Sequence, residues 1–134
     1  LVHDAARPLT PPQVTERVID AVVGGAGAVI PVLPVTDTLK TVDAFGVVVG
    51  TPRRSDMVAV QTPQGFRWDV LIRAHEEGAS LGTDEARAAT DDAGLVEAIG
   101  GTVHTVAGDE RSMKVTRPLD LALAQILVAE ETSA

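Results

Sequence analysis

Hydrophobic positions along the chain alternate between helical spacing and short continuous runs, and Gly and Pro residues separate the two kinds of segment. Apolar residues recur every three to four positions between Thr10 and Gly24, which predicts a helix with Thr10 as its N-cap and Gly24 at its end. The continuous apolar run of residues 28–33 predicts a buried strand of the kind found in parallel sheets. With an opening strand at residues 1–4, the pattern predicts a strand–helix–strand unit.

The middle of the chain has a thinner and more polar pattern. Three short β-like runs occupy residues 38–42, 47–49 and 57–61, with glycines and a Thr-Pro pair between them. Such punctuation is typical of antiparallel strands joined by turns. We therefore predict a projecting antiparallel arm at about residues 38–60.

Helical spacing returns in the last third of the chain. Residues 68–77 and 91–99 are predicted to be helices that end at glycines, and residues 102–106 alternate like a strand. A final helix is predicted to start at Thr116 and Pro118. Its expected core stripe consists of Leu119, Leu123, Ile126 and Leu127.

These elements together predict an α/β fold. In open sheets of this class, ligands bind at the carboxyl ends of parallel strands. Asp4 and Arg7 follow directly after the first predicted strand, and they are therefore candidate site residues. A structural ion pair between the two side chains, with no ligand, explains the same spacing equally well.

Composition narrows the possible functions. The 134 residues suffice for one domain, and the absence of Cys excludes disulfides, thiolate metal sites and a Cys nucleophile. The net charge of −8 argues against a general nucleic-acid binder. The sequence contains no run of about 18 apolar residues, so no membrane span is predicted. A cytoplasmic location is expected. Only two of the 11 cationic residues are lysines, Lys40 and Lys114, so their positions are informative.

Other polar clusters have ordinary structural explanations when each is considered separately. Asp37 and Thr38 fit a turn, Arg53 and Arg54 fit a solvated loop, and residues 62–64 fit a rigid turn. Residues 112–116 fit an edge strand with a solvent-facing Lys. No pair of His and Glu has the spacing of a zinc site.

Taken in order, however, five segments carry a specific resemblance. They are VHDAARP at 2–8, PVTDTLK at 34–40, QTPQGF at 61–66, TDDAGLVE at 90–97 and MKVTRPLDLALA at 113–124. The chain resembles 2-C-methyl-D-erythritol 4-phosphate cytidylyltransferases over nearly its whole length. The resemblance implies a Rossmann-like nucleotidyltransferase sheet with a projecting β-arm. It also implies transfer of CMP from CTP to 2-C-methyl-D-erythritol 4-phosphate, with release of pyrophosphate.

The resemblance implies roles for individual residues. Lys114 would stabilise charge at the reacting phosphates, and Asp4 would bind substrate or a divalent metal, expected to be Mg²⁺. The remaining expected substrate-binding residues are Arg7, Thr38, Arg54, Thr62 and Thr90. A second TDEA segment at 83–86 also fits the family pattern around Thr90, but the spacing to Lys114 favours Thr90 and makes residues 83–89 a small insertion.

Two further expectations follow from the resemblance. The family's Gly-rich nucleotide loop precedes the segment that matches residues 2–8, so residues 1–134 are expected to be the C-terminal part of one nucleotidyltransferase domain, inactive without the N-terminal part. The arm is expected to form a homodimer. The alternatives are a ribitol 5-phosphate cytidylyltransferase, which shares several of these segments, and a non-catalytic dimerisation or binding fragment.

Overall fold

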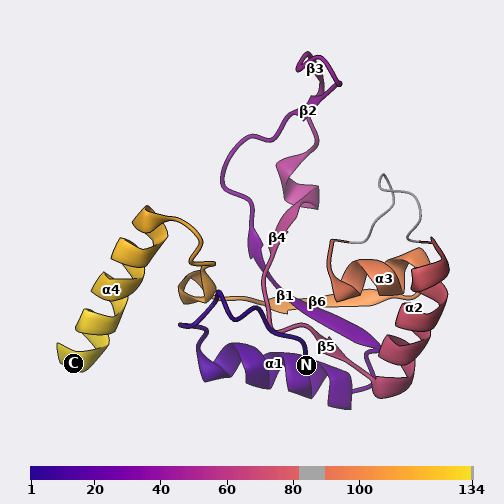
Figure 1. Cartoon of the computed structure of the whole chain (residues 1–134), viewed down its shortest axis with the longest axis horizontal. Helices are drawn as coiled ribbons and strands as arrows, with labels where there is room; N and C mark the ends of the chain where they lie inside the picture. Colours follow the sequence, from indigo (N-terminus) through magenta and orange to yellow (C-terminus); the bar gives the residue numbers. More distant parts are fainter. Residues whose placement is uncertain (82–89, 134) are drawn as a thin grey trace.

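The computed structural model describes residues 1–81 and 90–133 of the chain. It contains a mixed sheet flanked by helices, a separate two-stranded sheet on an extended arm, and a C-terminal helix beyond one end of the main sheet (Figure 1). The predicted α/β class is confirmed in this form. No helix of the described residues is long and apolar enough to cross a membrane.

The main sheet is organised around strand β1 (Ala28–Pro34). Strand β6 (Val103–Ala107) pairs with β1 in parallel, whereas β4 (Val58–Val60) and β5 (Gly65–Phe66) pair with it antiparallel. The opening strand predicted at residues 1–4 is reduced to a single bridging residue. Val2 forms a single antiparallel bridge to Gln64, because the segment leading into β5 lies beside residues 1–4.

Helices cover both faces of β1 at its start. Ala28 and Val29 point to opposite faces because successive strand residues alternate, and both are fully buried. Helix α1 (Pro12–Val23) packs on β1 and β6 through its buried Val14 and Val18. Its N-cap is Pro11, and Thr10 instead donates a hydrogen bond to the Arg7 carbonyl.

Helices α2 (Trp68–Leu81) and α3 (Asp92–Ala98) cover the opposite face of β1 from α1. Ala28 packs there with Ala74 of α2 and Val96 of α3. Helix α2 continues through Gly78, where the sequence pattern predicted its end, because that glycine lies against the Leu95 side chain of α3. This close helix pair fixes the position of the α3 N-terminus beside the sheet.

The arm and the last helix have little contact with this body. Strands β2 (Thr41–Val42) and β3 (Val48–Gly50) pair at the end of the arm, and a short 3₁₀ helix, η1 (Arg54–Asp56), leads back to β4 (Figure 1). A second 3₁₀ helix, η3 (Glu110–Ser112), follows β6.

Helix α4 (Pro118–Ser133) does not present the predicted core stripe. Leu119 is 73% exposed, and Leu123 and Ile126 are also exposed. The reason is that α4 extends away from the sheet, so that only Ala124 and Asp120 are buried among its described side chains (Figure 1).

Candidate functional site

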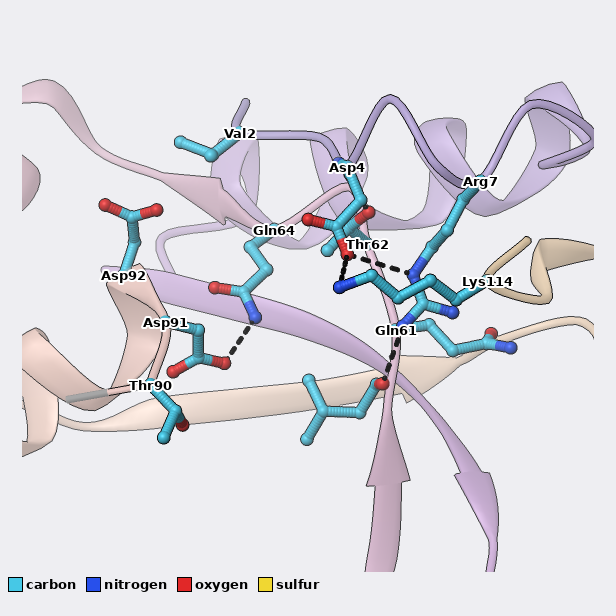
Figure 2. A pocket seen from close by; sticks show the side chains of 11 residues that line it. Val2, Asp4, Arg7, Gln61, Thr62, Gln64, Thr90, Asp91, Asp92 and Lys114 are labelled. Carbon is cyan, nitrogen blue, oxygen red and sulfur yellow. Dashed lines mark hydrogen bonds and ion pairs between the residues drawn. The ribbon is translucent and has the colours of Figure 1, made fainter. Parts of the chain in front are cut away.

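One pocket of about 300 Å³ brings together residues from four distant segments of the chain. It lies at the edge of the main sheet, between the N-terminal segment, the start of α3 and the segment after η3 (Figure 2). Five of the residues predicted from the sequence line it: Asp4, Arg7, Thr62, Thr90 and Lys114.

Asp4 is the electrostatic centre of the pocket. Its Oδ2 lies 3.1 Å from Lys114 Nζ and 3.5 Å from Arg7 Nε (Figure 2). The hydrogen bond from Lys114 is the main cause that lowers the pKa of Asp4, with a smaller effect from Arg7 that opposes the cost of desolvation. Asp4 is therefore a carboxylate at neutral pH, and it holds the Lys114 ammonium at the pocket.

Arg7 connects three parts of this site. Its side chain is 12% exposed, and its Nη1 donates to the Ser112 carbonyl at 2.6 Å. Its Nη2 makes a longer bond of 3.4 Å to the Val60 carbonyl at the end of β4. The expected Asp4–Arg7 ion pair thus exists, but it belongs to a larger set of contacts around the pocket.

The backbone on either side of Lys114 is held by the N-terminal segment. The Val115 amide donates to the Ala6 carbonyl at 2.7 Å, next to the bond from Arg7 to Ser112. Half of the Lys114 side chain is exposed. The ammonium therefore has a fixed base and an accessible tip, as required of a cation that contacts a bound phosphate.

Thr62 and Thr90 lie on different walls of the pocket. The Thr62 hydroxyl accepts the Asp4 amide at 3.0 Å and lies 2.8 Å from His3 Nδ1. The Thr62–Pro63 peptide bond is cis. Thr90 is exposed and immediately precedes Asp91, the N-cap of α3, whose Oδ1 accepts the Gly94 amide at 2.8 Å.

Thr38 and Arg54 do not reach this pocket within the same chain. Thr38 is exposed at the base of the arm, and Arg54 donates to the Thr36 carbonyl at 2.7 Å. Arg54 lines a separate, more open pocket of about 460 Å³ with Pro34, Val35, Thr36 and Ser55. The second TDEA segment at 83–86 lies outside the described residues.

The sequence interpretation missed several residues of the pocket. Gln61 and Gln64 line it, as do Val2, Val60, Asp91 and Asp92. The two glutamines flank Thr62 and Pro63 in the QTPQGF segment, and both are almost fully buried. Polar side chains beside a proline were the available signal, but nothing in their spacing indicates which partners they bind.

The pocket offers few protein ligands for a metal ion. Among residues 1–81 and 90–133, no group of three or more acidic or His side chains is arranged to hold a metal ion. Asp91 and Asp92 line the pocket, but Asp91 binds Gln64 and Gly94, and Asp92 Oδ1 lies 2.7 Å from His75 Nε2. Asp4 is paired as well, through Oδ2 with Lys114 and Arg7.

Comparisons with known proteins agree with one another. A family model of 2-C-methyl-D-erythritol 4-phosphate cytidylyltransferase matches residues 1–130. Curated proteins of that name from Rhodococcus jostii and Frankia casuarinae are 54% and 57% identical over 97% and 96% of this chain. The chain spans 54% and 46% of their respective lengths, which is about half.

Solved structures support the same relationship. The crystal structure of 2-C-methyl-D-erythritol 4-phosphate cytidylyltransferase from Thermus thermophilus aligns with a TM-score of 0.81 and 40% identity. That alignment covers 96% of this chain and 61% of the Thermus chain. The bifunctional IspDF from Campylobacter jejuni aligns with a TM-score of 0.67 and 28% identity, over 90% of this chain and 29% of its own.

Proposed function

Because this chain belongs to the 2-C-methyl-D-erythritol 4-phosphate cytidylyltransferase family, we propose that a polypeptide containing it transfers CMP from CTP to 2-C-methyl-D-erythritol 4-phosphate. The observation that carries the proposal is the pocket in which Lys114 and Arg7 converge on Asp4. Since the chain spans about half the length of its curated relatives, we expect residues 1–134 alone to be inactive.

The proposed reaction needs no covalent protein intermediate. A phosphate oxygen of the methylerythritol phosphate attacks the α-phosphorus of CTP, and the bond to the bridging oxygen breaks to release pyrophosphate. The barrier arises from bringing two polyanions together and from negative charge in the transition state. A cation held in place before the reaction lowers this barrier, and Lys114 has the required fixed base and exposed tip.

Arg7 and Asp4 support that cation in different ways. The Asp4 carboxylate holds the ammonium of Lys114 at 3.1 Å until substrate phosphates compete for it. Arg7 fixes the Ser112 carbonyl, two residues before Lys114, and its guanidinium also faces the pocket, where it would contact substrate. Thr62 and Thr90 would contact substrate from the two side walls.

A divalent metal ion fits this donor set. Mg²⁺ at nucleotide sites commonly takes one or two protein carboxylates and completes its shell with phosphate oxygens and water. Asp4 is the residue that would hold it, and the bound ion would neutralise charge on the triphosphate. This contribution from a single carboxylate agrees with the lack of a larger ligand cluster among the described residues.

Thr38 and Arg54 would serve the site of a second copy. They lie away from their own chain's pocket, next to an arm whose large apolar side chains are exposed, including Phe45, Val47, Val48 and Val49. A two-stranded arm buries little apolar surface by itself, so a partner that covers this surface would stabilise it. We propose that two copies associate through the arm and that each arm completes the other copy's pocket.

The test is pyrophosphate release by the complete polypeptide with CTP and methylerythritol phosphate. Lys114→Ala should lower turnover by about 10²-fold, the scale for removing a preorganised charge-stabilising group. Lys40→Ala is the matched control, because Lys40 bonds Thr51 on the arm and is outside the pocket. Equal and mild effects of both variants would contradict the role of Lys114. Ribitol 5-phosphate as a competing substrate tests the alternative activity, which the family match does not favour.

A further inference from the structure

We infer that Gln61 and Gln64 are positioning residues that hold the two opposite walls of the pocket. Gln61 would hold the wall that carries Lys114, and Gln64 the wall that carries Thr90. The inference rests on the proposed function, since it assigns these residues to the proposed reaction. The two side chains point in different directions from one short segment (Figure 2).

Both glutamines are buried more deeply than any of the charged groups of the pocket. Gln61 is 4% exposed and Gln64 is 2% exposed. A buried carboxamide is costly unless both its oxygen and its nitrogen find partners. In each residue, the oxygen accepts a backbone amide and the nitrogen donates to another oxygen. These pairings use a donor and an acceptor on the same group, which ionised Glu and Met do not provide.

The Gln61 side chain makes two hydrogen bonds to the backbone of Asp109, where the segment that leads to Lys114 begins. Its Oε1 accepts the Asp109 amide at 3.0 Å, and its Nε2 donates to the Asp109 carbonyl at 2.8 Å. Asp109 in turn caps η3, since its side chain accepts the Arg111 amide. Gly108 has no side chain, and a Cβ there would collide with Gln61 Oε1. These two hydrogen bonds therefore require the backbone at Gly108 to approach the Gln61 side chain closely.

Gln64 performs the corresponding task on the other wall. Its Nε2 donates to Asp91 Oδ2 at 2.7 Å, and its Oε1 accepts the Ala93 amide at 3.1 Å. Asp91 directly follows Thr90 and caps α3. The Gln64 backbone also pairs with Val2 in both directions, at 2.8 and 2.9 Å. One residue thus connects the segment of Asp4 to the start of α3.

Thr62 completes this frame between the two glutamines. Its hydroxyl accepts the amide of Asp4. Residues 61–64 consequently contact each of the three segments that supply the charged and hydroxyl groups of the pocket. A rigid frame matters for catalysis because a misplacement of about 1 Å can reduce the rate by about 10²-fold.

The experiment uses Gln61→Met and Gln64→Met in the complete polypeptide, since Met keeps the volume and removes both hydrogen bonds. Val14→Ala is the control, because Val14 is fully buried in α1 and does not line the pocket. Amide hydrogen exchange should accelerate about tenfold at Asp109 in the first variant and about tenfold at Ala93 in the second, the scale of one lost hydrogen bond. Exchange at the other variant's amide should stay unchanged.

Steady-state kinetics then separate positioning from general destabilisation. Gln61→Met should lower kcat by about tenfold and leave KM within about twofold, because Lys114 acts in the transition state. Gln64→Met should raise the KM for the methylerythritol phosphate by about tenfold with a smaller effect on kcat, because Thr90 would bind the ground state. Val14→Ala should change neither kcat nor KM.

Several results would overturn the inference. Exchange that accelerates at both amides in both variants would show general loosening, and identical kinetic losses in both variants would show no division of roles. The same changes in kcat or KM in Val14→Ala would show that the kinetic effects arise from general destabilisation. If the wild-type polypeptide transfers no CMP, the proposed function fails, and the exchange pattern alone then decides whether the two glutamines hold separate walls.

Discussion

Replacement of Arg7 by lysine tests whether this residue acts mainly through its positive charge or through its geometry. The guanidinium donates to the Ser112 carbonyl at 2.6 Å and to the Val60 carbonyl at 3.4 Å, and its Nε lies 3.5 Å from Asp4 Oδ2. Lysine keeps the charge but has one compact donor group in place of a planar fork. It therefore cannot maintain contacts to three separate segments.

The expected magnitude follows from the quality of each contact. A hydrogen bond from a charged donor contributes about 1.5–3 kcal/mol, and only the bond to Ser112 is both short and partly buried. The bond to Val60 is long, and the ion pair with the partly exposed Asp4 is weakened by solvent. We expect Arg7→Met to lower the free energy of unfolding by about 3 kcal/mol and Arg7→Lys by about 2 kcal/mol.

Urea unfolding of the complete polypeptide measures both values. The matched control is Arg17→Lys, because Arg17 also donates to two carbonyls, Ala107 at 2.8 Å and Gly108 at 3.2 Å. The bond to Ala107 is solvent-exposed and the partly buried bond to Gly108 is longer than the Arg7–Ser112 bond, so Arg17→Lys should cost about 1 kcal/mol, less than Arg7→Lys. If Arg7→Lys remains within about 0.5 kcal/mol of the wild type, the range of ordinary surface substitutions, then charge alone suffices and the geometric argument is refuted.

Two further predictions concern the C-terminal helix and the arm. Asp120 accepts the Thr116 and Arg117 amides at the start of α4, as well as hydrogen bonds from the Arg117 side chain. Together these bonds lower the pKa of Asp120 to about 2, and the side-chain bond from Arg117 has the largest effect. A carboxylate with a depressed pKa stabilises the fold above its unfolded pKa of about 4, and this effect is lost as the pH falls towards 2. Asp120→Asn should therefore destabilise the protein at pH 7 in urea unfolding and have little effect near pH 2; an equal loss at both pH values would contradict the assignment. For the arm, mixing inactive Lys114→Ala and Arg54→Ala polypeptides should restore roughly a quarter of wild-type activity after subunit exchange, since about half of the dimers are mixed and one of their two sites carries neither defect. Background activity after confirmed exchange would rule out a site shared between copies.

Local elements of this protein were predictable from its sequence because they depend on residues close in the chain. The apolar spacing before Gly24 predicted α1, and the run at residues 28–33 predicted β1 to within one residue at its end. The grouping of Asp4 and Lys114 was predicted only through the resemblance of whole segments, since 110 positions of sequence separate the two residues.

Only the tertiary structure decided the directions of the strands and the burial of polar side chains. Strand β1 is parallel to β6 and antiparallel to β4 and β5, and no periodicity in β1 distinguishes these partners. The apolar pattern of α4 predicted a buried stripe, yet Leu119 is exposed because no described part of the sheet lies against it. Conversely, Gln61 and Gln64 are polar but buried, because their partners are backbone groups and an aspartate brought near by folding. Hydrophobic spacing reports what one segment favours by itself, whereas burial and pairing depend on which distant segments meet.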